Sequence, residues 1–195
     1  MIVLGLDQAP RGIGWAYGEP GSVPARGWRE NPDYDDNEEL LLDDITDWLV
    51  TFVRAHKIER IYYEQIIVRT TRVNTKTTYK QFAVWSAIMC AARELGMPRH
   101  HCRITFISDW RAEFHHGMRP QRGHDGSESD AWKAMAVKEC ARRGWWTDDH
   151  NAAEACGIWD YGCKCEDKVY RARSKVATRR AEHAADEARR EALAI

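Results

Sequence analysis

The hydrophobic positions of this chain follow two kinds of pattern, which alternate over its first two thirds. Short apolar runs bounded by turn residues predict β-strands, at residues 2–6, 13–17, 25–30, 58–64 and 103–107. Helices are predicted at residues 36–56, 77–95, 109–116, 127–143 and 151–162. In the first helix the apolar residues recur every three or four positions, which places its acidic residues outward.

The order of these elements predicts the fold class. The first two strands flank a turn containing Pro10 and Gly12, so they are expected to form a hairpin. Alternation of helix and strand then favours an α/β fold, with a mixed sheet flanked by helices. Residues 164–195 are charged and Ala-rich, which predicts a helical C-terminal tail after one domain over residues 1–163.

Composition excludes several classes of protein. The mean hydropathy is -0.63, and no apolar run approaches the roughly 18 residues that a membrane span needs, so no membrane partner is expected. The N-terminus lacks the basic region of a signal peptide, which favours an intracellular protein. The six cysteines are therefore expected to be free thiols, and the single residue between Cys163 and Cys165 argues against a zinc site.

A net charge of -1 hides a separation of charge along the chain. Residues 30–47 carry many acids and no Lys or Arg, whereas residues 69–80 and 168–180 carry only basic charges. Such basic stretches suit a phosphate backbone, although charged runs are often only solvated faces. The basic block at 168–180 is expected to bind DNA or, as an Ala-rich helix, to pair with a partner helix.

Three carboxylates stand where elements begin or end. Asp7 ends the first strand, Glu64 ends the fourth, and Glu154 lies in the first turns of a late helix. If the first and fourth strands are neighbours, a helix across the sheet end can bring all three together. Clustered acids repel one another unless they hold a divalent cation such as Mg²⁺ or Mn²⁺. Singly, they also suit ordinary roles at turns and on the surface, with Asp148 or Asp149 as a helix N-cap.

The segments around these acids carry a family resemblance. Residues 2–7 read Ile-Val-Leu-Gly-Leu-Asp and lead through a turn to Ile13-Gly14-Trp15, residues 61–65 read Ile-Tyr-Tyr-Glu-Gln, and residues 151–158 read Asn-Ala-Ala-Glu-Ala-Cys-Gly-Ile. In this order they resemble the first, second and last motifs of RuvC-type Holliday-junction resolvases. The resemblance spans residues 1–162 and is closest to divergent phage-encoded members.

The resemblance implies an RNase H-like fold with a mixed five-stranded sheet, and hydrolysis of phosphodiesters with two Mg²⁺ ions per site, for which Mn²⁺ would substitute. Asp7 would bridge the ions, and Glu64 and Glu154 would complete the catalytic ligands. The family usually has Asp at the position of Glu154. Its remaining helix ligand falls on Asn151, with His150 as an equal candidate and Asp149 behind them.

The resemblance also implies branched DNA as substrate, a homodimer as the working assembly and no nucleotide cofactor. Candidate DNA contacts are Arg69, Arg72, Lys76, Lys80, Arg119, Arg122 and Lys133. The aromatic wedge that some members carry is replaced here by Ile67, which weakens the case for four-way junctions. A helical stripe of aromatic residues is expected to lie in the core or at a dimer interface, or to include a base-stacking residue, and comprises Tyr79, Phe82 and Trp85.

Three functions follow for comparison. The favoured one is a Mg²⁺-dependent, structure-selective endonuclease that resolves Holliday junctions or other branched DNA, acting in the cytoplasm of a bacterium or a phage-infected cell. The second is a catalytically weakened RNase H-like module that binds branched DNA, since Asn151 and Glu154 replace the expected pair. An actin-like kinase or ATPase is disfavoured because the chain lacks a clear second phosphate loop.

Overall fold

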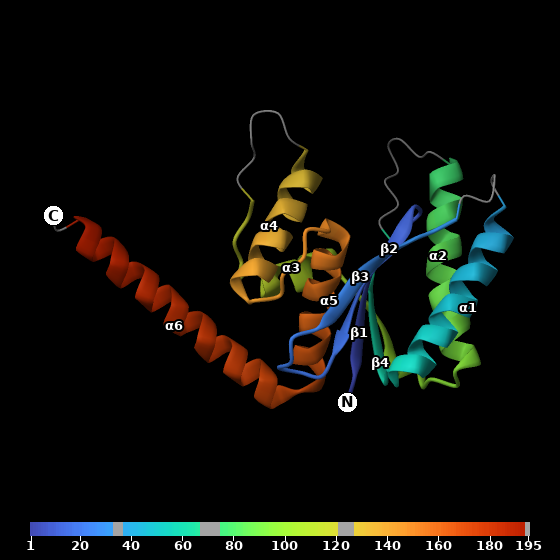
Figure 1. Ribbon diagram of the computed structural model, residues 1–195, viewed down its shortest axis with the longest axis horizontal. Helices are drawn as coiled ribbons and strands as arrows, with labels where there is room; N and C mark the ends of the chain where they lie inside the picture. Colours follow the sequence, from blue (N-terminus) through green and yellow to red (C-terminus); the bar gives the residue numbers. More distant parts are fainter. Residues whose placement is uncertain (33–36, 67–74, 121–126, 194–195) are drawn as a thin grey trace.

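The computed structural model describes residues 1–32, 37–66, 75–120 and 127–193. Its centre is one five-stranded sheet in the order β3-β2-β1-β4-β5 (Figure 1). The strands are β1 Val3–Ala9, β2 Gly12–Gly18, β3 Ala25–Glu30, β4 Arg60–Glu64 and β5 Cys102–Thr105. The strands β1 to β3 pair antiparallel, whereas β1, β4 and β5 are parallel. The predicted mixed sheet is therefore confirmed.

Helices flank the sheet, as the sequence predicts. They are α1 Glu38–His56, α2 Thr75–Glu94, α3 Ile107–Phe114, α4 Glu128–Arg142, α5 His150–Glu166 and α6 Lys168–Leu193, with a short 3₁₀ turn at Arg99–His101. Across the described residues, none of the helices combines the length and the apolar character that a membrane crossing requires.

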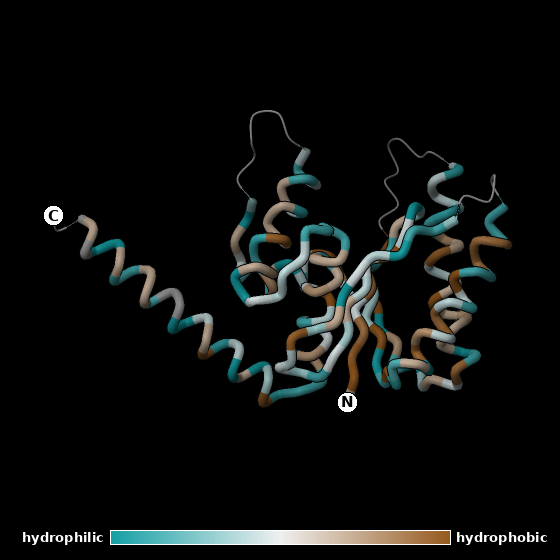
Figure 2. The backbone as a smooth tube through the Cα atoms, in the orientation of Figure 1, coloured by the Kyte–Doolittle hydropathy of each residue, from teal (hydrophilic) through white to brown (hydrophobic). Residues whose placement is uncertain are grey.

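The two faces of the sheet carry two separate cores. Leu4 and Leu6 of β1 point to one face and pack with α1 and α2, whereas Val3 points to the other and packs with α3, α4 and α5. This alternation is the two-residue period of a strand. Figure 2 shows hydrophobic residues concentrated on the strands and inner helices, while α6 is largely hydrophilic.

Glycines let α5 lie directly on the sheet. A Cβ at Gly5 of β1 would lie 2.7 Å from the carbonyl oxygen of Ala155 and closer still to the backbone nitrogen of Trp159. A Cβ at Gly14 of β2 would overlap the carbonyl group of Asn151. The first motif therefore has glycine where the helix backbone touches the strands, and this contact fixes the height of α5 above Asp7.

The end of the chain differs from the sequence prediction in one detail. Helix α5 continues to Glu166 instead of ending near 162, so the predicted boundary after residue 163 falls inside it. Asp167 then caps the next helix by accepting hydrogen bonds from the backbone N–H groups of Val169 and Tyr170. From this corner α6 runs away from the body of the protein (Figure 1).

Candidate metal and nuclease site

Parallel pairing of β1 and β4 brings the first two carboxylates together. Leu6 is in register with Tyr63, so Asp7 and Glu64 follow side by side. Glu64 ends β4 as predicted, whereas β1 continues for two residues beyond Asp7 because the hairpin pairing with β2 extends to Ala9. The side chain of Gln8 secures this alignment. Its amide oxygen accepts a hydrogen bond from the backbone N–H of Glu64 (3.1 Å), and its amide nitrogen donates to the Glu64 carbonyl.

Helix α5 brings the third carboxylate to the same place. Gly14, which pairs with Asp7 across the hairpin, touches Asn151, and Gly5 touches Ala155. Glu154 lies between these two contact points on α5 and is only 5% exposed. The structure thus gathers the three acids that the sequence singles out, from two strands and a helix.

The electrostatics of the three groups are coupled. Burial raises the pKa of Asp7 well above its usual value, and the charges of Glu154 and Glu64 raise it further. Burial also raises the pKa of Glu64 to about 7, with Glu154 adding to the effect and a hydrogen bond from Trp110 opposing it. Lys133 of α4 and Arg111 of α3 lower the pKa of Asp7. The result is a partly buried acidic cluster with two cations beside it.

Two consecutive residues of α3, which the sequence analysis missed, hold two of these carboxylates. The indole Nε1 of Trp110 donates a 2.8 Å hydrogen bond to Oε1 of Glu64. The guanidinium of Arg111 forms a 2.8 Å ion pair with Oε1 of Glu154 and stacks against the rings of Trp110 and Trp132. Helix α3 therefore orients the side chains of both Glu64 and Glu154.

The chemistry of the donor set fits a divalent cation. All three groups offer carboxylate oxygens, the ligands that Mg²⁺ and Mn²⁺ prefer, and their mutual repulsion is what a bound cation would relieve. Within the described part of the chain, no three His, Cys, Asp or Glu side chains are already arranged around one point as metal ligands. In the structure, Oε1 of Glu154 is paired with the guanidinium of Arg111 on α3.

The three candidates for a further ligand occupy different positions. Asp149 is the N-cap of α5, and its Oδ1 accepts hydrogen bonds from the backbone N–H groups of Asn151 and Ala152, both 2.8 Å long. His150, the first residue of the helix, is exposed, and Asn151 is half-buried against β2. The capping role predicted as the alternative for Asp149 is confirmed. The choice between His150 and Asn151 stays a prediction.

The predicted DNA contacts divide into three groups. Lys133 lies close enough to Asp7 to lower its pKa, so it belongs to the site itself. Arg119 is exposed in a groove of about 640 Å³ that also contains Arg111 and Trp132. Lys76 and Lys80 lie in the first turns of α2. Arg69, Arg72, Arg122 and the wedge position Ile67 lie outside the described residues.

Comparison with solved structures identifies the fold. Thermus thermophilus RuvC in complex with a Holliday junction substrate matches with a TM-score of 0.60 at 13% identity, over 83% of this chain and 92% of that one. A second structure of the same enzyme gives a TM-score of 0.54 at 16% identity over the same shares. The yeast mitochondrial Holliday junction resolvase Ydc2 gives 0.56 at 11% identity, over 89% of this chain and 80% of that chain.

These three matches agree with one another on the fold. The chain has an α/β architecture and adopts the fold of the RuvC and Ydc2 structures. No family model matches the sequence. No curated protein matches it either.

Proposed function

We propose that this protein is a divalent-metal-dependent endonuclease that resolves Holliday junctions or other branched DNA. The observation that carries the proposal is the convergence of Asp7, Glu64 and Glu154 at one end of the sheet, with Arg111 and Lys133 beside them. Two carboxylates whose pKa values are raised beside a third, with cations next to them that offset part of the charge, suit phosphodiester hydrolysis.

Each residue has a part that follows from its position. Asp7, Glu64 and Glu154 would hold two Mg²⁺ ions, with His150 or Asn151 as a further ligand. The bound ions would supply an activated water and stabilise the leaving oxygen. Trp110 orients Glu64, Arg111 orients Glu154, and Lys133 neutralises part of the charge near Asp7. In the adjoining groove, Arg119 is placed to contact a flanking phosphate.

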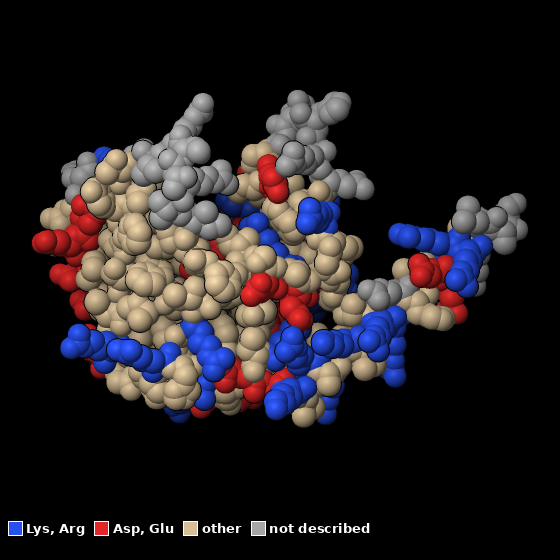
Figure 3. All heavy atoms as spheres, turned by 180° about the vertical axis from the view of Figure 1, so that it is seen from behind, with Lys and Arg blue, Asp and Glu red and all other residues tan. Residues whose placement is uncertain are grey.

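A homodimer is part of the proposal, because symmetric resolution of a junction requires two active sites related by a two-fold axis. Helix α2 and strand β5 offer a face for it. Five large apolar side chains on these elements and at the end of β5 are 41 to 60% exposed: Tyr79, Phe82, Met89, Ile104 and Phe106. Seen from behind, this side of the molecule has a broad area without charged side chains (Figure 3). We call this area the α2–β5 face.

Packing of the neighbouring side chains joins the two parts of the α2–β5 face. The hydroxyl of Tyr63 lies 3.0 Å from the sulfur of Met89 on α2, and Tyr63 is in register with Ile104 of β5. Of the three aromatic residues in the helical stripe, Trp85 packs against the core beside Tyr63.

The test is cleavage of a labelled four-way junction in Mg²⁺, Mn²⁺ or EDTA, with linear duplex and flap DNA for comparison. Wild type is expected to make paired, symmetric nicks with either metal. Asp7→Asn is expected to lose about a hundredfold or more in rate, as is typical when one preorganised catalytic group is removed. Asp47→Asn, which removes an exposed carboxylate of α1, is the matched control and should cut normally.

A second candidate function is a binding module that has lost most of its activity. The observation favouring it is the engagement of Glu154 by Arg111, together with a neutral amide at Asn151. Tight junction binding without cleavage in either metal would select this function. Absence of both binding and cleavage would refute both candidates.

A further inference from the structure

A second groove lies on the far side of α3 from the acidic cluster, where α6 leaves the body. Its volume is about 410 Å³. The residues that line it are Ala112, Glu113, His116, Lys164, Ser174, Lys175, Thr178 and Arg179. We call it the α6 groove. Nothing in the proposed catalytic arrangement uses it.

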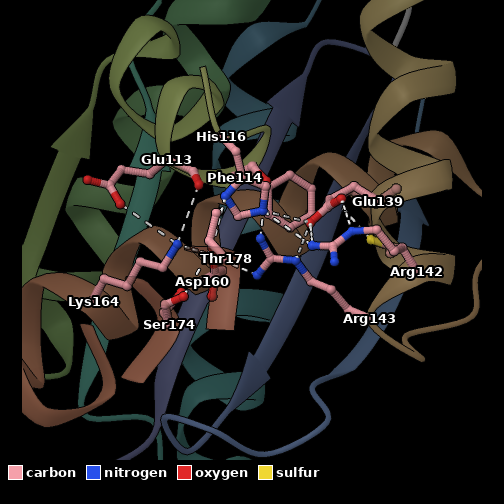
Figure 4. A network of polar contacts seen from close by, with 12 residues as sticks. Glu113, Phe114, His116, Glu139, Arg142, Arg143, Asp160, Lys164, Ser174 and Thr178 are labelled. Carbon is pink, nitrogen blue, oxygen red and sulfur yellow. Dashed lines mark hydrogen bonds and ion pairs between the residues drawn. The ribbon is translucent and has the colours of Figure 1, made fainter. Parts of the chain in front are cut away.

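A buried polar network fixes the walls of the α6 groove (Figure 4). Asp160 of α5 is fully buried and forms ion pairs with Arg143 (3.0 Å) and Lys164 (2.9 Å). It also accepts a 2.6 Å hydrogen bond from the hydroxyl of Tyr170 on α6. Two of the helices that form the groove are thus tied together at one point.

A second set of contacts ties α6 to the end of α3. The hydroxyl of Thr178 lies 3.2 Å from Nδ1 of His116, and the guanidinium of Arg171 pairs with Glu113 at 3.3 Å. The first half of α6 is therefore held in place beside α3, and this fixes where its cations leave the helix.

The charge of the α6 groove is positive. Lys175 and Arg179 are exposed, and in the described part of the chain neither has an ion pair. The acid in the groove, Glu113, is already engaged by Arg171 at 3.3 Å and by Lys164 at 3.8 Å. Uncompensated cations on a helix held in position are the electrostatic signature of a polyanion site.

The spacing of these cations suits a linear polyanion. Arg171, Lys175 and Arg179 recur every four residues, so they form a row along one side of α6, with about 6 Å of helix between successive members. A second row, on the opposite side of the helix, contains Arg173 and Arg180.

The α6 groove shares one lining residue of α3 with the groove beside the acidic cluster. The latter is lined by Arg111, Ala112 and Arg119, and Ala112 belongs to both. A nucleic acid strand in contact with Arg119 would reach Lys175 and Arg179 by crossing α3 at the small side chain of Ala112. This path leads away from the acids along basic residues.

We propose that the α6 groove, with Lys175 and Arg179, binds the phosphate backbone of a duplex arm that flanks the cut site. This inference rests on the proposed function, since it assigns a further part of the same DNA substrate. It predicts that α6 contributes affinity for long arms and takes no part in the chemical step. It also assigns to the basic block of residues 168–180 a DNA role in preference to pairing with a partner helix.

The experiment uses Asp7→Asn protein, so that DNA is bound and not cut, with four-way junctions whose arms are either long or a few base pairs long. Adding Lys175→Gln and Arg179→Gln should weaken binding of the long-arm junction about tenfold. The plot of log binding constant against log salt concentration should also become less steep by about 1.8, because each of the two lost phosphate contacts contributes about 0.9. Binding of the short-arm junction should not change.

The matched control is Arg173→Gln with Arg180→Gln, which removes the same charge from the opposite side of α6. Equal weakening by both pairs would overturn the proposed groove in favour of a general charge effect. No change with Lys175→Gln and Arg179→Gln would overturn it outright.

In otherwise wild-type protein, the Lys175→Gln and Arg179→Gln pair should cut at the wild-type rate at saturating DNA. Normal junction cutting with unchanged affinity would thus refute the α6 groove and leave the nuclease standing, whereas no junction binding by wild type would refute both.

Discussion

The indole of Trp110 is a positioning group for Glu64, and this role can be separated from its role in packing. Trp110 is fully buried, and its Nε1 donates to Oε1 of Glu64. Trp110→Phe keeps an aromatic ring and removes the donor, so the carboxylate loses its fixed orientation. Partners of metal ligands are typically worth 10- to 100-fold in metal affinity or activity. We expect the Mg²⁺ concentration for half-maximal cleavage to rise by about tenfold, measured by metal titration.

Trp145→Phe is the control for this experiment. Trp145 is buried in the same core, stacks on Phe114 and meets Trp159 edge to face, but among the described residues its indole has no hydrogen-bond acceptor. A loss of packing alone would affect both variants similarly. If the Mg²⁺ requirement shifts as much in Trp145→Phe as in Trp110→Phe, the hydrogen bond is not what orients Glu64.

Individual residues also show which parts of the site sequence reasoning can reach. Asp7, Glu64 and Glu154 can be found from the sequence because each stands near the end of a recognisable element, and the order of elements implies where those ends meet. Trp110 and Arg111 sit in a short helix with no motif. Their partners Glu64 and Glu154 are 46 and 43 residues away, so only the folded structure pairs them.

Among the elements, α5 depends most directly on glycine. Gly5 of β1 has the backbone of α5 against it, so the Cβ of Gly5→Ala overlaps the backbone near Trp159 and Ala155. Backbone atoms cannot rotate away as a side chain can, so α5 must move away from the sheet. This movement increases the distance between Glu154 and Asp7. Overpacking of this kind typically costs 1–3 kcal/mol. We expect a loss of about 2 kcal/mol in the free energy of unfolding, measured by urea denaturation, and a loss of cleavage under conditions where the variant is still folded.

Gly18→Ala tests whether the effect comes from the helix contact. The added Cβ at Gly18 would lie 2.8 Å from the hydroxyl oxygen of Ser22, a side chain that can rotate away. This variant should retain most of its stability and its activity. Equal damage from both substitutions would mean that strand glycines matter here for another reason than the height of α5.

The elements themselves were largely predictable, and the error in α5 has a physical cause. Gly162 looks like a helix end, since glycine is common there. In the structure it lies inside α5, where a Cβ would come within 2.6 Å of the ring of Tyr62. At this position glycine allows close packing of α5 against the ring of Tyr62 and does not end the helix. A sequence alone does not distinguish these uses, because the ring it packs against comes from β4.

Over the whole molecule, charge is segregated in a way that suits a protein lying on DNA. Acidic side chains gather on α1 at one edge, basic side chains gather on the first half of α6 at the other, and the α2–β5 face lies between them (Figure 3). The acidic edge repels a phosphate backbone while α6 attracts it. The charged stretches of the sequence predict both the acidic edge and the basic edge. The α2–β5 face joins residues from two elements, so it can be recognised only in the folded structure.

The α2–β5 face leads to a prediction about assembly. A homodimer built on this face would bury Phe82, and a charge there would lose its water on association. Substitution of a central apolar side chain typically costs 2 kcal/mol or more of binding free energy. We expect Phe82→Asp to raise the dimer dissociation constant by about 30-fold or more, measured by sedimentation equilibrium. Paired nicks in a junction should then become single, uncoordinated nicks at protein concentrations where the variant is monomeric.

Val23→Asp is the matched control, because Val23 is also an exposed apolar side chain but lies in the loop before β3, at the opposite edge of the sheet. It should dimerise and nick in pairs like wild type. If Phe82→Asp leaves the dissociation constant unchanged while wild type is dimeric, the two-fold axis lies elsewhere. A monomeric wild type that still makes paired nicks would show that the junction itself brings the two copies together, and the α2–β5 face would then have no part in assembly.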